Sequence, residues 1–98
     1  MFNLFRSSPT PTVNFHNLVE NGAKLIDVRN VNEYRAGHIP GSINIPLREL
    51  QNRMDELDSP SDDVVVHCQS GGRSANAAGF LRRSGFSAVH DLGSIRNW

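Results

Sequence analysis

Residues 64–74 read VVVHCQSGGRS and decide the fold of this 98-residue chain. The first three residues are β-branched valines, and together with His67 they are typical of a short strand buried on both faces. The two glycines permit a tight loop, and residues 73–84 then have helical spacing, with Ala77, Ala78 and Leu81 on the inner side. A buried strand that leads through a loop into a helix indicates a parallel sheet covered by helices.

Alternating strands and helices are also predicted on either side of this unit. The predicted strands are 25–28, 42–45, 64–67 and 88–90, and the predicted helices are 14–21, 30–37, 46–57, 73–84 and a closing turn at 93–98. Asn30 and Glu33 have the spacing of a capping box, and Gly85 with Phe86 predicts a Schellman ending. We therefore expect an α/β fold, a small parallel sheet of four to five strands with helices on both faces.

Composition indicates an ordinary globular domain, with 38% hydrophobic residues and a formal net charge of zero. We expect one domain over residues 13–98, preceded by a loose arm at 1–12 that is rich in serine, threonine and proline. No basic stripe suggests nucleic acid, and no apolar run is long enough to span a membrane. Without a signal-peptide pattern, and with one cysteine that cannot form an internal disulfide, a cytoplasmic monomer is the expectation.

Cys68 is the strongest candidate for a reactive group. It follows the 64–67 strand, and ligands bind at the carboxyl ends of strands in open parallel sheets. Backbone N–H groups of the glycine loop and of the next helix's first turn can converge there on an anion. We expect the cradle to lower the Cys68 pKa by about two units or more from about 8.5. The competing interpretation is an inert buried thiol.

The loop supplies further candidate ligands. Arg73 ends it, and a guanidinium provides the planar fork of donors that suits an oxyanion near the cysteine. Arg29 could reach the same face, although a structural pair with Asp27 or Glu33 is the favoured interpretation. The predicted substrate-binding residues are Gln69, Ser70, Gly71, Gly72, Arg73, Ser74 and Arg29. Ser70 and Ser74 could instead serve only as helix caps.

We expect the histidines to have structural roles and not catalytic ones. Strand alternation turns His67 away from the neighbouring Cys68, and His38 is expected to fix the turn before Pro40. His16 and His90 have no partners that their spacing reveals. A lone cysteine beside a histidine lacks the ligand set of a zinc site, so no metal is predicted.

Four stretches resemble, in order, the motifs of the rhodanese family, and the resemblance extends from about Phe15 to Trp98. They are DVR at 27–29, YRAGHIPGSINI at 34–45, CQSGGRS at 68–74 and GSIRNW at 93–98. Residues 68–73 are similar to the family's six-residue active-site loop. Ser42 stands where alanine is usual, and a single glycine stands at 93 where a pair is frequent.

The resemblance implies a sulfurtransferase of the thiosulfate sulfurtransferase type. Cys68 would take a sulfane sulfur from thiosulfate or a persulfide, hold it as a persulfide, and pass it to cyanide or a thiol. No cofactor is implied, and a sulfur-carrier protein is a further candidate partner. With no second cysteine in the chain, the acceptor must come from outside.

Two other functions stay open at this point. A cysteine phosphatase or arsenate reductase of the same fold carries one more residue between cysteine and arginine. Here four residues separate Cys68 from Arg73, which suits a sulfur atom better than a tetrahedral oxyanion. A non-catalytic rhodanese-like binding or regulatory module is the second alternative, although such domains usually lack the cysteine.

Overall fold

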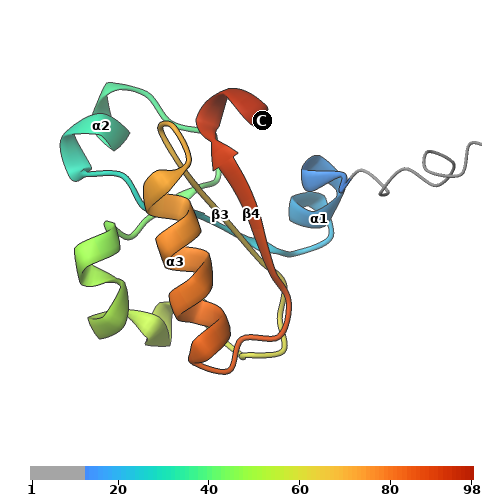
Figure 1. The fold of residues 1–98 in the computed structure, drawn as a ribbon. Helices are drawn as coiled ribbons and strands as arrows, with labels where there is room; N and C mark the ends of the chain where they lie inside the picture. Colours follow the sequence, from blue (N-terminus) through green and yellow to red (C-terminus); the bar gives the residue numbers. More distant parts are fainter. Residues whose placement is uncertain (1–12) are drawn as a thin grey trace, which may run out of the picture.

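The structure is a computed structural model that describes residues 13–98. The arm predicted at 1–12 lies outside the described residues. Four parallel strands form one sheet in the order β2-β1-β3-β4 (Figure 1). Their bounds are Lys24–Asp27 for β1, Ile43–Asn44 for β2, Val64–Cys68 for β3 and Val89–Ser94 for β4. The α/β class and the parallel sheet are confirmed.

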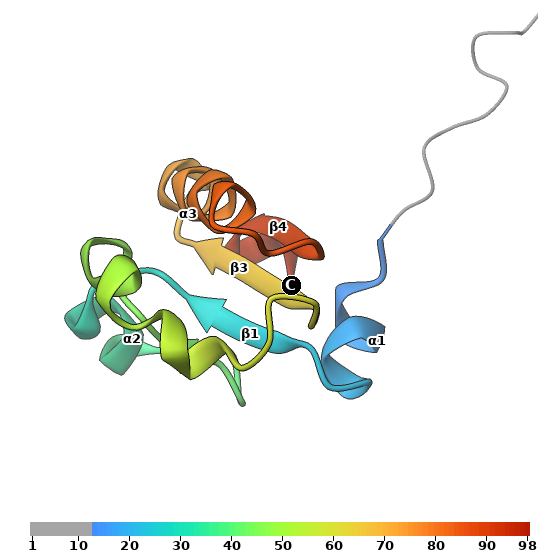
Figure 2. The same ribbon diagram turned by 90° about the horizontal axis from the view of Figure 1, so that it is seen from below.

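Helices cover both faces of the sheet. The α-helices are α1 (Phe15–Glu20), α2 (Val31–Ala36) and α3 (Gly72–Arg83), and the 3-10 helices are η2 (Leu47–Asn52), η3 (Met54–Leu57) and η4 (Ile95–Asn97). Figure 2 shows α1 on the opposite side of the strands from α3. None of the helices within residues 13–98 combines the length and the apolar character needed to cross a membrane.

The central strand β3 organises the core because all five of its residues are buried. Its side chains alternate between the two faces. Val64, Val66 and Cys68 belong to the larger apolar cluster, which α3, η2 and η3 cover. Val65 belongs to a smaller cluster beneath α1 and η4. Cys68 therefore lies on the α3 face of the sheet.

Local sequence signals set the helix ends, and two of them, the capping box of α2 and the Schellman ending of α3, were predicted. The Asn14 side chain caps α1 by accepting from the Asn17 amide at 3.0 Å. Asn30 and Glu33 form the capping box of α2. At the end of α3, Gly85 has φ of 101°, and the Phe86 amide donates to the Leu81 carbonyl at 3.0 Å. This bond completes the Schellman motif and places the buried Phe86 in the same cluster as Leu81.

The single helix predicted over 46–57 is wrong, because two 3-10 helices, η2 and η3, meet at Arg53. A 3-10 helix aligns residues three apart. Leu47 and Leu50 have that spacing, as do Met54 and Leu57, so each short helix directs one apolar pair toward the core. Three-residue spacing cannot distinguish the two helix types.

The last strand is longer than predicted. It runs from Val89 to Ser94, whereas residues 88–90 were expected to be strand and 93–98 a helical turn. Asp91 pairs with Val66 and Gly93 with His67, which leaves Leu92 as the extra residue of a β-bulge. Gly93 adopts φ of 80° there. The bulge carries the strand past Gly93, where the closing helical turn was predicted to begin, and the turn that does form is the 3-10 helix η4 at Ile95–Asn97.

Candidate functional site

The site lies where β3 meets α3. Cys68 is the last residue of β3, and residues 69–71 form the loop that leads into α3 at Gly72. Gly71 adopts φ of 111°, a left-handed conformation that side chains disfavour. This conformation turns the loop back over the strand end, so the N-terminus of a twelve-residue helix faces the cysteine.

Backbone amides converge on the cysteine sulfur. The Gly71 amide donates to Cys68 Sγ at 3.0 Å, and the Ser74 amide donates to it at 3.3 Å. Burial raises the pKa of the Cys68 thiol, but hydrogen bonds from Ser74, Gly71 and Ser70 outweigh burial and lower that pKa overall. The loop therefore stabilises a negative charge on sulfur.

The thiol itself is covered in this conformation. Only 1% of the surface of Cys68 is exposed. A nucleophile that meets its substrate directly would be more exposed than this. The cover on the loop side is thin, because Gln69, Ser70 and Gly72 are exposed and Gly71 and Arg73 are partly so. Core packing covers the strand side, so a sulfur donor would have to approach through the loop.

Arg73 lies at the beginning of α3, and its guanidinium is engaged by a carboxylate. Nη1 lies 2.6 Å from Glu33 Oε1, and Nη2 lies 3.0 Å from Glu33 Oε2. The hydrogen bond with Glu33 raises the pKa of Arg73, so the guanidinium stays charged. The predicted pairing of Arg73 with an anion at Cys68 would compete with this ion pair for the same donors.

Arg29 is held beneath the loop in a buried ion pair. Its Nη2 lies 2.7 Å from Asp27 Oδ2, and its Nε contacts both Asp27 oxygens. The remaining donors reach Gln69 Oε1 at 3.1 Å and the Gly37 carbonyl at 2.8 Å. The structural pairing with Asp27, which was the favoured interpretation, is what the structure contains. Arg29 contacts the loop through Gln69 rather than through the sulfur.

Two residues that hold the loop were not predicted. Ser94 on β4 donates through its hydroxyl to the Gln69 carbonyl at 2.8 Å. Glu33, expected only as a cap or a partner of Arg29, pairs with Arg73. Neither contact has a local signal in the sequence, although the carboxyl-edge position of each residue follows once the strand order is known.

The histidines lie outside the sulfur cradle. His67 is fully buried on the opposite face from Cys68, its Nε2 is 3.8 Å from Asp27 Oδ2, and burial lowers its pKa. His38 stacks on Tyr34 with ring centroids 3.8 Å apart. His16 stacks on Trp98, and His90 pairs with Asp63 at 2.9 Å. Within residues 13–98, no cluster of three His, Cys, Asp or Glu side chains is arranged to hold a metal ion.

Comparison with known proteins identifies relatives of this chain. Residues 13–98 match a family described as the rhodanese-like domain. The uncharacterized protein YqhL of Bacillus subtilis is 43% identical over 79 residues, which cover 78% of this chain and 60% of that protein. The thiosulfate sulfurtransferase PspE of Escherichia coli is 34% identical over 73 residues, which cover 74% of this chain and 70% of PspE.

A solved structure has the same fold. The human single-domain sulfurtransferase TSTD1 superimposes with a TM-score of 0.72 and 31% identity, over 91% of this chain and 95% of that one. The chain thus spans less than two thirds of YqhL but nearly all of TSTD1.

Proposed function

The chain belongs to the family of rhodanese-like domains, and from that premise we propose that it is a sulfurtransferase that works through a persulfide on Cys68. The observation that carries the proposal is the pair of amide hydrogen bonds to Sγ, from Gly71 at 3.0 Å and from Ser74 at 3.3 Å. A thiolate is the nucleophilic form of cysteine, and these donors favour it. The terminal sulfur of a persulfide anion is stabilised by the same kind of contact.

The first half-reaction takes sulfur from a donor such as thiosulfate. The Cys68 thiolate attacks the outer sulfur, an S–S bond forms to Cys68, and the S–S bond of thiosulfate breaks. Sulfite leaves with that bond's electron pair. The product is the Cys68 persulfide, and no external oxidant or reductant is consumed.

The second half-reaction returns Cys68 to its starting state. A nucleophile such as cyanide attacks the terminal sulfur, and the persulfide S–S bond breaks. The electron pair returns to Cys68 as thiolate, and thiocyanate is released. A thiolate acceptor would leave with the sulfur as its own persulfide in the same way.

Access to the sulfur requires the loop to move. Two hydrogen bonds to Gln69 hold the loop in place. Arg29 donates to the Gln69 side chain at 3.1 Å, and the Ser94 hydroxyl donates to the Gln69 carbonyl at 2.8 Å. Release of these two bonds would let residues 69–70 swing outward without disturbing β3. An anionic donor would then reach the amide cradle, and it would bind Arg73 in competition with Glu33.

A mass measurement tests the proposal. The protein is incubated with thiosulfate, and intact-mass spectrometry is expected to find the added mass of one sulfur atom, which cyanide then removes. Cys68→Ser is expected to gain no sulfur and to keep the circular dichroism spectrum of the wild type. A wild-type protein that stays unmodified would contradict the proposal and favour a binding or regulatory module.

The physiological donor and acceptor need a further screen with thiols and persulfides. A role in the cytoplasm as a monomer stays a prediction. Phosphate-ester turnover by the wild type would favour the phosphatase alternative, against which the four-residue spacing between Cys68 and Arg73 argues.

A further inference from the structure

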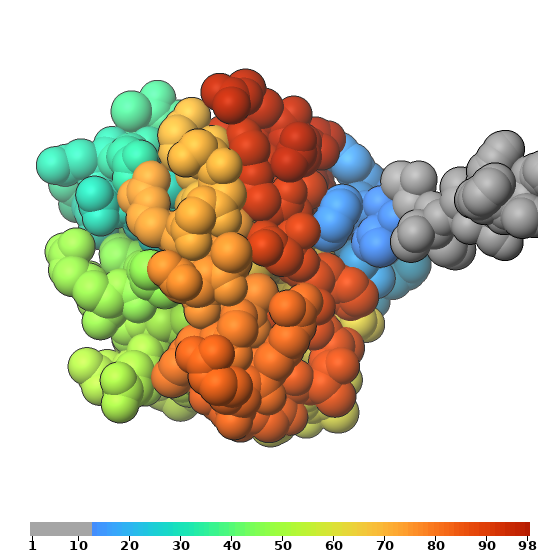
Figure 3. Space-filling model, in the orientation of Figure 1, coloured from blue at the N-terminus to red at the C-terminus, as the bar shows by residue number. Residues whose placement is uncertain are grey.

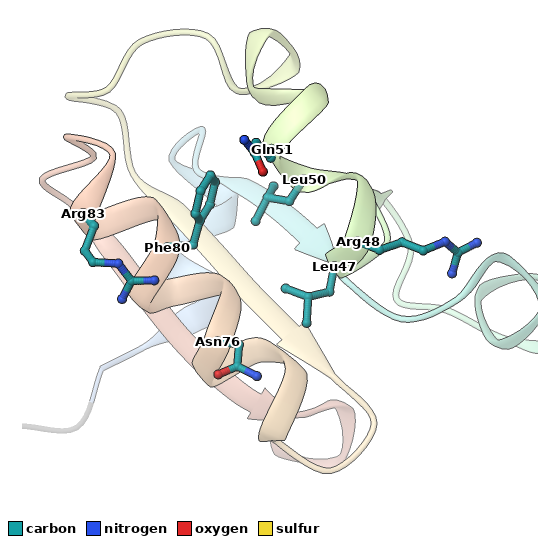
Figure 4. A pocket seen from close by; sticks show the side chains of 7 residues that line it. All are labelled: Leu47, Arg48, Leu50, Gln51, Asn76, Phe80 and Arg83. Atoms are coloured by element: carbon teal, nitrogen blue, oxygen red, sulfur yellow. The ribbon is translucent and has the colours of Figure 1, made fainter.

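A groove separates η2 from α3, which lie side by side on the face seen in Figure 3. Its volume is about 370 Å³, within the range of ligand-binding sites. Leu47, Leu50 and Phe80 form an apolar floor, and in Figure 4 these side chains extend into the space between the two helices. The floor offers a place for an apolar group from a partner.

The rim of the groove is positively charged. Arg48 on η2 and Arg83 on α3 line it together with two neutral polar residues, and no acidic residue lines it. Arg48 has 72% of its side chain exposed, its Nη2 lies 4.0 Å from Glu49 Oε2, and its Nη1 donates to Asn30 Oδ1 at 3.5 Å, so its guanidinium extends away from the groove in this conformation (Figure 4). None of the ion pairs within residues 13–98 involves Arg83. The chain as a whole has no net charge, so the groove is a local concentration of cationic groups.

One end of the groove points toward the sulfur site, by which we mean Cys68 and the loop at residues 69–73. Both of its walls begin at the carboxyl edge of the sheet, where Leu47 follows β2 and Gly72 follows β3. On α3, Arg73, Phe80 and Arg83 are separated by seven and three residues, a spacing that puts them along one side of a helix. A segment that occupies the groove would therefore extend toward Arg73 and the loop over Cys68.

We propose that this groove docks the protein that exchanges sulfur with Cys68, and that the docking segment carries an apolar side chain flanked by carboxylates. The inference rests on the proposed function. The apolar side chain occupies the floor, and the carboxylates pair with Arg83 and with Arg48, whose exposed side chain turns toward the groove and gives up its long contact with Asn30. The same contacts hold the partner's thiol or persulfide near the loop and raise its effective concentration at Cys68.

The dimensions favour a peptide segment. Ten residues of α-helix separate Arg73 from Arg83, which amounts to about 15 Å along the axis. An extended chain covers that length in about five residues, at roughly 3.3 Å for each. A segment of this size, with its thiol at the Arg73 end, fills the groove and reaches the loop.

Synthetic peptides provide the probe. We would compare three thiol acceptors that each have a terminal cysteine: Cys-Gly-Glu-Phe-Glu-Leu, the same peptide with lysine for glutamate, and the same peptide with serine for phenylalanine and leucine. The measured quantity is the second-order rate of sulfur transfer from the Cys68 persulfide. The first peptide is expected to exceed both others by roughly tenfold or more at low ionic strength, and salt is expected to reduce its advantage over the lysine peptide.

Charge reversal locates the effect. Arg48→Glu combined with Arg83→Glu is expected to remove the preference for the acidic peptide while leaving the thiosulfate-to-cyanide rate unchanged. Arg82→Glu makes the same kind of charge change at an exposed neighbour of Arg83 that does not line the groove, and should retain the preference. Equal rates with all three peptides, or an unaltered preference in the double variant, would overturn the inference.

The controls separate the two hypotheses. If the wild type gains no sulfur from thiosulfate, the proposed function fails. If it turns over cyanide normally but shows no peptide preference, only the docking inference fails.

Amide NMR signals of Asn76 and Phe80 test for other occupants of the groove. Signals that shift on dilution would assign the groove to a second copy, and signals that shift in Phe5→Ser would assign it to the chain's own N-terminal residues. Either result would overturn docking by a partner.

Discussion

The guanidinium of Arg73 and the carboxylate of Glu33 form a two-pronged ion pair, with N–O distances of 2.6 and 3.0 Å. Glu33 also accepts from the Asn30 amide at 3.0 Å as part of the α2 capping box. One carboxylate thus joins the first turns of α2 and α3 at the rim of the sulfur site. Hydrogen bonds from Arg73 and Asn30 lower the pKa of Glu33 to about 2.

Replacement of this carboxylate should reveal a pH-dependent contribution to stability. Because the folded-state pKa lies below the ordinary value of 4.5, the contribution is fully present above that value and is lost as pH falls toward 2. Glu33→Gln should lose about 0.2–1 kcal/mol at pH 7, the usual range for an exposed pair. Urea denaturation should show the two proteins converging as pH falls from about 4.5 to 2.

Glu33→Ala is the matched control because alanine removes the cap as well as the ion pair. Glutamine can still accept from the Asn30 amide, so the alanine variant should lose about 1 kcal/mol more than the glutamine variant. A Glu33→Gln difference that stays constant between pH 7 and pH 2 would contradict the assignment to the ion pair.

The Ser74 hydroxyl should help to set the ionisation of the cysteine. Ser74 contributes through its backbone and its side chain to the lowered pKa of Cys68. Its hydroxyl carries one proton, which it can donate either to the sulfur or to the Gly71 carbonyl at 3.1 Å. Ser74→Ala retains the amide and removes the hydroxyl, so the Cys68 pKa should rise. The rate of thiol alkylation against pH measures it, with the midpoint of the profile moving to higher pH.

Ser70→Ala tests whether any lost hydroxyl near the loop has this effect. Ser70 contributes to the lower pKa through its backbone amide alone, so its alkylation profile should match the wild type. If the two serine variants have the same midpoint, the Ser74 hydroxyl plays no part in the ionisation.

The parts of the fold that were predicted correctly depend on local patterns. The β-branched run of β3 and the Gly85-Phe86 ending of α3 are each specified within a few residues of the chain. The two 3-10 helices were not predicted because apolar residues three apart suit either helix type. The extension of β4 through Gly93 depends on a bulge opposite His67, which is a property of strand pairing and not of β4 alone.

In the site, the contacts within the loop were predicted and the contacts between distant residues were not. A cysteine after a buried strand, followed by two glycines and a helix, fixes the cradle locally, and the Gly71 and Ser74 amides lie at the sulfur as the loop suggests. The Arg73–Glu33 pair joins residues 40 apart, and the Ser94–Gln69 bond joins residues 25 apart. Such contacts require the strand order β1-β3-β4, which the sequence pattern leaves undetermined.

Asp27 should be among the most sensitive positions for stability. Its side chain is fully buried beside Arg29, whose side chain is 5% exposed. Asp27→Asn leaves the buried guanidinium without a counter-charge, and such a change costs about 3–5 kcal/mol. Urea denaturation at pH 7 measures the loss.

Asp58→Asn provides the comparison at the surface. Asp58 pairs with Lys24 at 2.9 Å, but its side chain is 61% exposed. Asp58 has φ of 60° and ψ of −117°, a type II′ turn conformation that aspartate and asparagine both adopt, so the variant should lose no more than about 1 kcal/mol. Equal losses in the two variants would refute a special cost for the buried pair.

Gly71 should be needed for the shape of the loop and Gly72 should not. Neither glycine has an atom within 4 Å of the position of an added Cβ, but only Gly71 has a positive φ, of 111°. Gly71→Ala should therefore cost about 1–2 kcal/mol through backbone strain alone, and relief of that strain turns the amide away from Sγ and raises the Cys68 pKa. Gly72→Ala lies in the first turn of α3 and should be neutral or stabilising by about 0.4–1 kcal/mol. Urea denaturation and the alkylation profile measure both effects, and an alanine at 71 that leaves both unchanged would mean that the left-handed turn does not hold the cradle.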